Sequence, residues 1–115
     1  MARYTLREVK DAALRCYEEK RLGAQNGKRQ CLYRYPEDDT RCAIGAALNN
    51  TDLRNACEHV GGILSLSGYK GILFEDEGIT EEIQHAHDIW LKLASRGEIE
   101  KAAVAEKRFL SLIKN

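Results

Sequence analysis

Residues 30–45 constrain the fold of this chain more than any other stretch. They read QCLYRYPEDDTRCAIG, with two cysteine-bearing apolar segments on either side of a polar turn that starts at Pro36. The alternation of apolar and polar residues before Pro36 is typical of a half-buried strand, which proline ends because it has no N–H to donate. The stretch therefore predicts a short β-hairpin over about residues 31–44, with Cys42 and Ile44 in its return strand.

A helix competes with the second half of this hairpin. Residues 42–48 contain three alanines followed by Leu48, a composition that favours helix. We expect a short return strand that runs directly into a helix.

An N-terminal helix is predicted by a capping box, in which the Thr5 and Glu8 side chains each accept a hydrogen bond from the other's backbone N–H. The helix is expected to end near Arg21, and Gly23 and Gly27 are expected to supply positive φ angles in the turn that follows. Apolar residues recur at helical spacing on its expected core face: Leu6, Val9, Ala13, Cys16 and Tyr17.

Two further helices are predicted near the C-terminus. Thr80 is expected to open the first, with Glu81 and Glu82 in its first turn, where carboxylates complement the helix dipole. Gly97 ends it, and a second helix from about Glu98 packs back as an antiparallel neighbour. The expected core residues are Ile83, Ala86, Trp90 and Leu93 in the first helix and Ile99, Ala102, Ala103, Phe109, Leu110 and Ile113 in the second.

The middle of the chain gives weaker signals. Asn50 or Thr51 is expected to cap a short helix that ends near Gly61. The apolar runs 63–66 and 72–74 are too short for periodicity to distinguish a strand from a buried loop.

Length and composition indicate one small domain. With 115 residues the chain can build a single modest core, so residues 1–115 are expected to form one α+β domain that is mainly helical and carries a short hairpin. No segment approaches the roughly 20 apolar residues of a membrane span, and the first residues lack the apolar region of a signal peptide. We therefore expect a cytoplasmic protein with reduced cysteines and no membrane partner.

The zero net charge hides an uneven distribution. Residues 74–100 carry a net charge of −6, whereas residues 1–42 and the last fifteen residues carry +3 each. The acidic band either forms an ordinary solvated helix face or attracts a basic partner surface. As a partner-binding site it comprises Glu75, Asp76, Glu77, Glu81 and Glu82.

The hairpin offers an alternative surface, because bases surround aromatic residues there as they do in proteins that bind single-stranded nucleic acid. The sequence pI of 6.8 lies below that of a dedicated nucleic-acid-binding domain, usually above about 9. The residues of this alternative site are Arg29, Tyr33, Arg34 and Arg41.

Metal and acid–base sites are weighed against structural roles. The side chains of His85 and His87 point about 200° apart on a helix, so they cannot chelate one ion, and we expect one polar group there to face the core and bond to the hairpin. We expect no catalytic residue, metal or cofactor, and a metal-assisted enzyme that uses His87 and Asp88 with ligands from other helices is the lowest-ranked alternative. A disulfide between cysteines 31 and 42 ranks behind two packed thiols. Zinc would require irregularly spaced ligands without a C-x-x-C pair: Cys16, Cys31, Cys42, Cys57 and His59.

Two motifs resemble a group of small uncharacterised proteins of phages and prophages. They are C-x-Y followed by C-A-I-G-x-x-L, and Q-x-A-H-D on a later helix. The chain departs from that pattern at Asp38-Asp39, where the group has a glycine, and lacks its acidic, proline-containing loop after G-x-x-L. The matching residues that we expect to be structural are Cys31, Cys42, Gly45, His87 and Asp88.

The resemblance implies a phage setting, in which small domains often bind and block host proteins. We expect a non-enzymatic accessory protein that binds and blocks a host macromolecule in the host cytoplasm, as an anti-CRISPR-like or other anti-defence inhibitor. Its expected partner is a host protein, such as a nucleic-acid-binding defence complex. A small nucleic-acid-binding regulator that uses the hairpin is the alternative, and we rank nucleic acid behind a protein partner.

Overall fold

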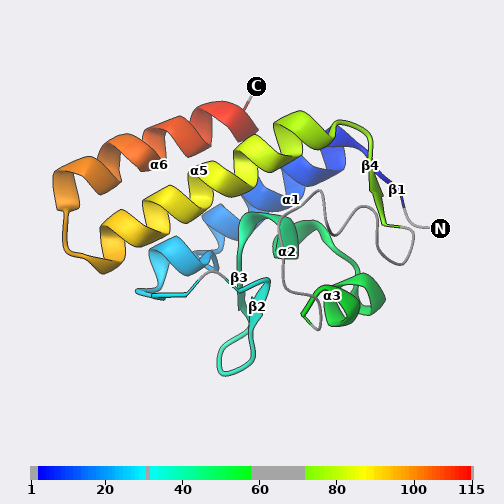
Figure 1. Cartoon of the computed structure of the whole chain (residues 1–115), viewed down its shortest axis with the longest axis horizontal. Coiled ribbons are helices and arrows are strands. Elements are labelled where there is room, and N and C mark those ends of the chain that lie inside the picture. The colour runs from blue at the N-terminus through cyan, green and yellow to red at the C-terminus, as the bar shows by residue number, and fades with distance from the viewer. Residues whose placement is uncertain (1–2, 31, 58–71, 115) are drawn as a thin grey trace.

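The protein has a mainly helical α+β fold, in which the long helices α5 and α6 run antiparallel beside each other and α1 packs against both (Figure 1). The computed structural model describes residues 3–30, 32–57 and 72–114. In chain order its elements are β1 (Arg3–Tyr4), α1 (Leu6–Glu18), the 3-10 helix η1 (Gly23–Gln25), β2 (Arg34–Tyr35), β3 (Thr40–Arg41), α2 (Ala43–Ala47), α3 (Asn50–Cys57), β4 (Leu73–Phe74), α5 (Glu77–Ser95) and α6 (Ile99–Ile113).

Helix α1 begins as predicted and ends earlier than predicted. The Thr5–Glu8 capping box is present at its start. At its end Lys20 adopts a positive φ of 59°, and the N–H groups of Lys20 and Arg21 donate to carbonyls of the last turn. This Schellman-type ending stops the helix at Glu18 rather than near Arg21.

The turn after α1 differs from the prediction at one glycine. Gly27 has the predicted positive φ (67°), whereas Gly23 begins η1 without one. Gly23 fits a confined space instead, because a Cβ there would lie 3.1 Å from the Leu91 Cδ1 and from the Tyr35 Oη, closer than most Cβ contacts.

The hairpin forms, but its return strand is displaced from the predicted one. Strand β2 ends before Pro36, as predicted, and pairs antiparallel with β3 over Thr40–Arg41. The placement of Cys42 and Ile44 in the return strand was wrong. Cys42 is the N-cap of α2, where its Sγ accepts the Gly45 N–H. The expectation of a short return strand that runs directly into a helix is confirmed, with β3 ending just before this N-cap.

The elements that follow α2 in the described residues are the helix α3 and the strand β4. Asn49 caps α3 by accepting the Asp52 N–H at 2.8 Å, so the prediction of Asn50 or Thr51 as the cap was wrong. The run 72–74 supplies β4, which pairs parallel with β1. The predicted end of the short helix near Gly61 and the run 63–66 lie outside the described residues.

Helix α5 begins three residues before Thr80. Asp76 accepts the Ile79 N–H at 2.9 Å, and this side-chain cap starts the helix at Glu77. Thr80 is therefore buried inside the helix rather than capping it. The helix ends as predicted, because Gly97 adopts a φ of 74° after the C-cap.

The core lies between α1, α2, α5 and α6. Trp90 and Phe109 pack with their ring centroids 5.6 Å apart, and the His87 ring packs against both. Most of the predicted core stripes are buried or half-buried, but Ile99 and Ala103 of α6 are exposed. Ile99 is 80% exposed because it begins α6, and Ala103 lies on the face of α6 that turns to solvent.

Candidate functional site

The predicted acidic surface divides into structural and exposed parts. Glu75 accepts a hydrogen bond from the Leu6 N–H at 3.1 Å, and Asp76 caps α5. These two carboxylates help to fix the starts of α1 and α5, which complement negative charge through their dipoles. Their capping roles make them poor choices for testing a binding surface.

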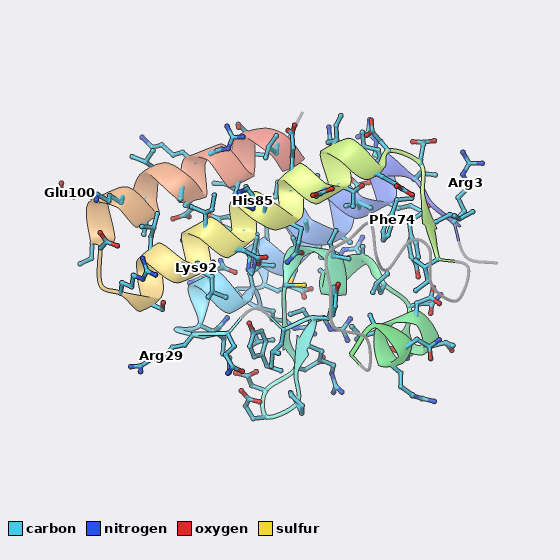
Figure 2. The ribbon with its side chains drawn as sticks, in the orientation of Figure 1. Arg3, Arg29, Phe74, His85, Lys92 and Glu100 are labelled. Carbon is cyan, nitrogen blue, oxygen red and sulfur yellow. The ribbon has the colours of Figure 1, made fainter. Side chains whose placement is uncertain are left out.

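The remaining predicted acids lie on α5 and project away from the core. Glu81 and Glu82 are exposed, and Glu77 is half-exposed. His85 of α5 is also exposed (Figure 2), and Ile89 has 38% of its surface exposed. His85 and Ile89 follow Glu81 at successive spacings of four residues, which places the three on one side of the helix. Within the described parts of the chain these three carboxylates make no hydrogen bond or ion pair through their side chains. We call Glu77, Glu81, Glu82, His85 and Ile89 the acidic face.

The basic residues of the hairpin meet acids of their own turn. Asp39 accepts hydrogen bonds from the Arg34 Nε at 2.7 Å and the Arg41 Nη2 at 3.3 Å through its Oδ1. Its Oδ2 accepts from the Arg21 Nη2 at 2.6 Å. The Arg34 hydrogen bond, aided by the nearby Arg41 and Arg21 charges, lowers the pKa of Asp39. One carboxylate thus organises three arginines.

Lys28 forms a second charge cluster at the tip of the turn. Its Nζ lies 2.7 Å from Glu37 Oε1 and 2.9 Å from Asp38 Oδ2. Hydrogen bonding from Lys28 and from Thr40 lowers the pKa of Asp38 to about 2. Much of the positive charge of this region is therefore matched by carboxylates of the same hairpin.

The aromatic residues of the hairpin do not form an open stacking platform. Tyr35 is only 3% exposed, and its hydroxyl donates to the Gln30 carbonyl. Tyr33 is half-buried, and Arg29 is exposed outside the strands. Nucleic-acid bases stack on exposed rings, so the placement of Tyr35 weakens the basic–aromatic interpretation.

The C-A-I-G and Q-x-A-H-D motifs meet in a partly buried network. The Gln84 Oε1 accepts the Ile44 N–H at 2.9 Å, and its Nε2 donates to the Asp88 Oδ1 at 2.9 Å. The same Asp88 oxygen lies 3.2 Å from the His87 Nδ1. The His87 Nε2 accepts the Ala24 N–H at 3.3 Å, so the Nδ1 carries the ring proton.

This network corrects one detail of the histidine prediction. His87 faces the core with no exposed surface and His85 is exposed, as the helical geometry predicts. The backbone partner of His87 belongs to η1, not to the hairpin. The network reaches the segment after the hairpin through the hydrogen bond from the Ile44 N–H to Gln84.

The motif cysteine that the structure describes, Cys42, is a buried thiol. Burial raises the pKa of Cys42 to about 12, well above its ordinary value near 9. Its Sγ accepts the Gly45 N–H at 3.2 Å. Because the thiolate is the nucleophilic form, this environment favours a structural role for Cys42 over a catalytic one.

We predict that the raised pKa of Cys42 makes stability fall with pH. Above the unfolded pKa near 9 and below the folded pKa near 12, only the native thiol keeps its proton. The free energy of unfolding should then fall by up to about 1.4 kcal/mol per pH unit. Cys42→Ser retains an acceptor for the Gly45 N–H but does not titrate in this range. Its free energy of unfolding, measured by urea unfolding between pH 9 and 10, should therefore fall less steeply with pH than that of the wild type. Equal slopes for the two proteins would contradict the prediction.

Metal ligands are not gathered in the described part of the chain. No group of three or more His, Cys, Asp or Glu side chains there could hold an ion, and Cys16 and Cys42 are separate free thiols. The structure does not describe Cys31, so the choice between two packed thiols and a disulfide for cysteines 31 and 42 lies outside the described residues. The side chains of Cys57 and His59 lie outside them as well.

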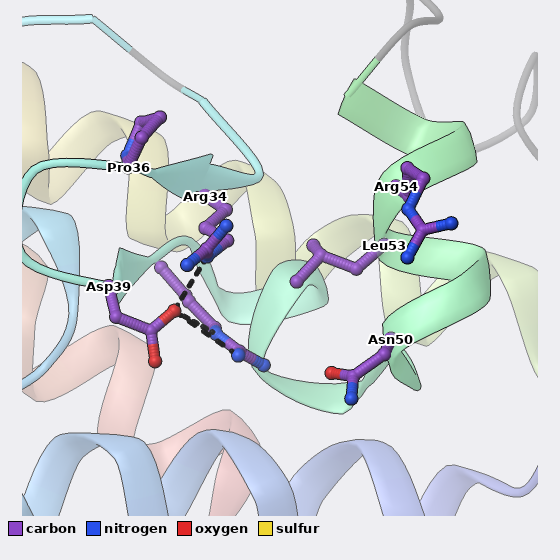
Figure 3. A pocket seen from close by; sticks show the side chains of 7 residues that line it. Arg34, Pro36, Asp39, Asn50, Leu53 and Arg54 are labelled. Carbon is purple, nitrogen blue, oxygen red and sulfur yellow. Dashed lines mark hydrogen bonds and ion pairs between the residues drawn. The ribbon is translucent and has the colours of Figure 1, made fainter.

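An open cleft of about 640 Å³ lies between the hairpin and α3 (Figure 3). We call it the arginine cleft, because Arg34 and Arg41 of the hairpin and Arg54 of α3 all line it. Asp39 lies among them, and its Oδ1 contacts both hairpin arginines. The complete lining is Arg34, Pro36, Asp39, Arg41, Asn50, Leu53 and Arg54.

Sequence reasoning missed two residues of this cleft that matter most. Asp39 was predicted only as part of a surface turn, and Arg54 was not singled out. An acid at a turn flanked by arginines on both strands is a usable signal for Asp39, because paired strands bring such residues together. No local pattern identifies Arg54, since only the packing of α3 places it opposite the hairpin.

Comparison with protein-family models, with curated protein sequences and with solved structures finds no match for this chain. In the described residues no helix has both the length and the apolar surface that a membrane span requires. Function is therefore inferred from the residues themselves.

Proposed function

We propose that this chain is a non-enzymatic accessory protein of the phage type, which binds a basic surface of a host macromolecule through its acidic face and blocks that surface. The expected target is a host protein in the cytoplasm, with a nucleic-acid-binding defence complex as the leading candidate. An anti-CRISPR-like or other anti-defence inhibitor would act in this way.

The observation that carries the proposal is the composition of the acidic face. Glu77, Glu81 and Glu82 present carboxylates that make no ion pair within the described parts of the chain. Such groups keep their charge for a partner, and a row of carboxylates resembles the phosphates that a nucleic-acid-binding surface accepts. The 38% exposed Ile89 adds an apolar contact beside them, as interface centres commonly have.

The buried motif supports a structural rather than a catalytic role for its residues. His87 has no exposed surface, and its two ring nitrogens contact Ala24 and Asp88. Cys42 is 1% exposed with a raised pKa. The side chains best suited to chemistry are thus used to join α5 to the segments that pack against it.

The nucleic-acid alternative draws less support from the geometry. Arg34 and Arg41 contact Asp39, and Lys28 contacts Glu37 and Asp38. A surface whose bases are matched by its own acids releases fewer counterions from a phosphate backbone. The hairpin therefore ranks behind the acidic face as the principal contact surface.

We predict that Glu81→Lys combined with Glu82→Lys weakens target binding by at least about tenfold, because reversed charges on the acidic face repel a basic surface. The target is first recovered with tagged wild-type protein from nuclease-treated host lysate and identified by mass spectrometry. Affinities of the purified pair are then measured by calorimetry at two salt concentrations. Wild-type affinity should fall with salt more steeply than that of the double variant.

Glu100→Lys is the matched control, because Glu100 is an exposed acid at the start of α6, at the far end of the α5–α6 pair (Figure 2). Its affinity should remain near that of the wild type. Equal affinities of the double variant and the wild type would remove the acidic face from the interface. Recovery that is lost on nuclease treatment would favour the nucleic-acid alternative.

A further inference from the structure

We infer that the arginine cleft is a second binding site, which takes a phosphomonoester of nucleotide size. The cleft lies between the hairpin and α3, whereas the acidic face lies on α5. Nothing in the proposed docking through α5 uses these residues, so the two sites can be tested separately.

The cleft carries a net positive charge from two walls. Arg34 and Arg41 on the hairpin wall face one lining carboxylate, Asp39, which neutralises only one of their two charges, and Arg54 adds a further charge from α3. Arg34 uses only its Nε for Asp39 among the contacts of the described residues, which leaves its two terminal nitrogens for a ligand. Arg54 is exposed and makes no ion pair within residues 3–30, 32–57 and 72–114.

Both walls are held in place before any ligand binds. On the hairpin wall, the Asp39 carboxylate accepts hydrogen bonds from Arg34 and Arg41. It also accepts one from Arg21, which connects this wall to the segment that follows α1. On the other wall, Asp52 of α3 accepts a 2.6 Å hydrogen bond from the Tyr4 hydroxyl. Preorganised walls reduce the entropy that binding costs.

The size and lining of the cleft indicate more than a bare phosphate. A volume of about 640 Å³ falls within the range of about 300–1,000 Å³ that small-molecule sites span. Figure 3 shows Leu53 and Asn50 of α3 across from Pro36 and Arg34 of the hairpin. The exposed Pro36 offers apolar surface for a ring, whereas Leu53 lies at the base of the cleft with only 4% of its surface exposed. The Asn50 amide can both donate and accept hydrogen bonds.

A phosphate suits this cleft better than a carboxylate. A phosphomonoester carries close to two negative charges at neutral pH and has three acceptor oxygens, so it can accept from guanidinium groups on both walls at once. A single carboxylate has one charge and two oxygens, so it brings less negative charge and one acceptor oxygen fewer than a phosphomonoester.

The test is an NMR titration of the ¹⁵N-labelled full chain with adenosine monophosphate, inorganic phosphate and succinate. We expect saturable shifts from adenosine monophosphate at residues 34–41 and 50–54, with a Kd of about 1 mM or lower. Inorganic phosphate should shift the same residues more weakly, and succinate should bind at least about tenfold more weakly than the nucleotide. Arg54→Gln should raise the nucleotide Kd at least about tenfold.

Arg108→Gln serves as the control, since Arg108 is an exposed arginine on α6, a helix that contributes nothing to the cleft lining. It should leave the Kd unchanged, as should the acidic-face double variant. Arg34→Gln, which also loses the Asp39 contact, should match or exceed the effect of Arg54→Gln. Absence of saturable shifts, equal binding of succinate, or an equal loss in Arg108→Gln would overturn the inference. Binding that requires an oligonucleotide would overturn it in favour of nucleic acid.

Discussion

Gly45→Ala should destabilise the protein by at least about 3 kcal/mol or prevent it from folding. A Cβ at Gly45 would overlap the Tyr33 carbonyl oxygen and lie 2.8 Å from its carbon and 3.3 Å from its Cα. These are backbone atoms that no rotamer change can move. The Gly45 N–H also caps the start of α2 by donating to Cys42, so a shift of α2 would disturb that contact as well.

Urea unfolding of Gly78→Ala provides the matched comparison. Gly78 lies in the first turn of α5, and its added Cβ would meet only the Asp76 Oδ1 at 3.6 Å, an ordinary contact distance. Alanine favours helix over glycine by up to about 1 kcal/mol, so this variant should be slightly more stable than the wild type. If the two variants changed the free energy of unfolding by similar amounts, the close contact between α2 and the hairpin backbone at Gly45 would be ruled out.

This close approach explains why the C-A-I-G motif has a glycine. Cys42 caps α2, Ile44 is fully buried, and Gly45 lets the hairpin backbone lie directly on the helix. The motif therefore connects the hairpin to the core, and its residues are structural in this fold. Function is then expected on the surfaces that this connection positions, which are the acidic face and the arginine cleft.

The sequence predicted correctly the helix ends that depend only on neighbouring residues. The Thr5–Glu8 capping box and the stop at Gly97 depend on residues within one or two turns, and both are present. The start of α5 was misplaced, because Thr80 and Asp76 are both good N-caps by type and only the folded chain selects Asp76. The return strand was misplaced for a similar reason, since Cys42 caps a helix there.

Contacts between residues that lie far apart in the sequence could not be predicted from it. Asp39 contacts Arg21 across 18 positions, and His87 accepts from Ala24 across 63 positions. No periodicity relates such residues, because their proximity follows from packing. The acidic surface was located by charge counting, yet only the structure separates the capping carboxylates of Glu75 and Asp76 from the exposed ones.

His87→Ala should destabilise the protein by about 3 kcal/mol, whereas His85→Ala should change stability by less than about 0.5 kcal/mol. His87 is fully buried between Trp90 and Phe109, so its removal leaves a cavity among aromatic rings. It also leaves the Ala24 N–H without its acceptor. His85 is exposed on the opposite side of the same helix.

His87→Phe separates the two contributions to this loss. It keeps a ring beside Trp90 and Phe109 but offers no acceptor to the Ala24 N–H, so it should cost about 1–3 kcal/mol for the unsatisfied donor. Chemical unfolding measures all three variants, and hydrogen exchange at the Ala24 amide should accelerate in both His87 variants but not in His85→Ala. Unchanged exchange at Ala24 would show that His87 acts through packing alone. Faster exchange at the Ala24 amide in both His87 variants would show that the Q-x-A-H-D motif holds η1 against α5 through a hydrogen bond. That bond is a structural reason for a histidine at a position with no access to solvent.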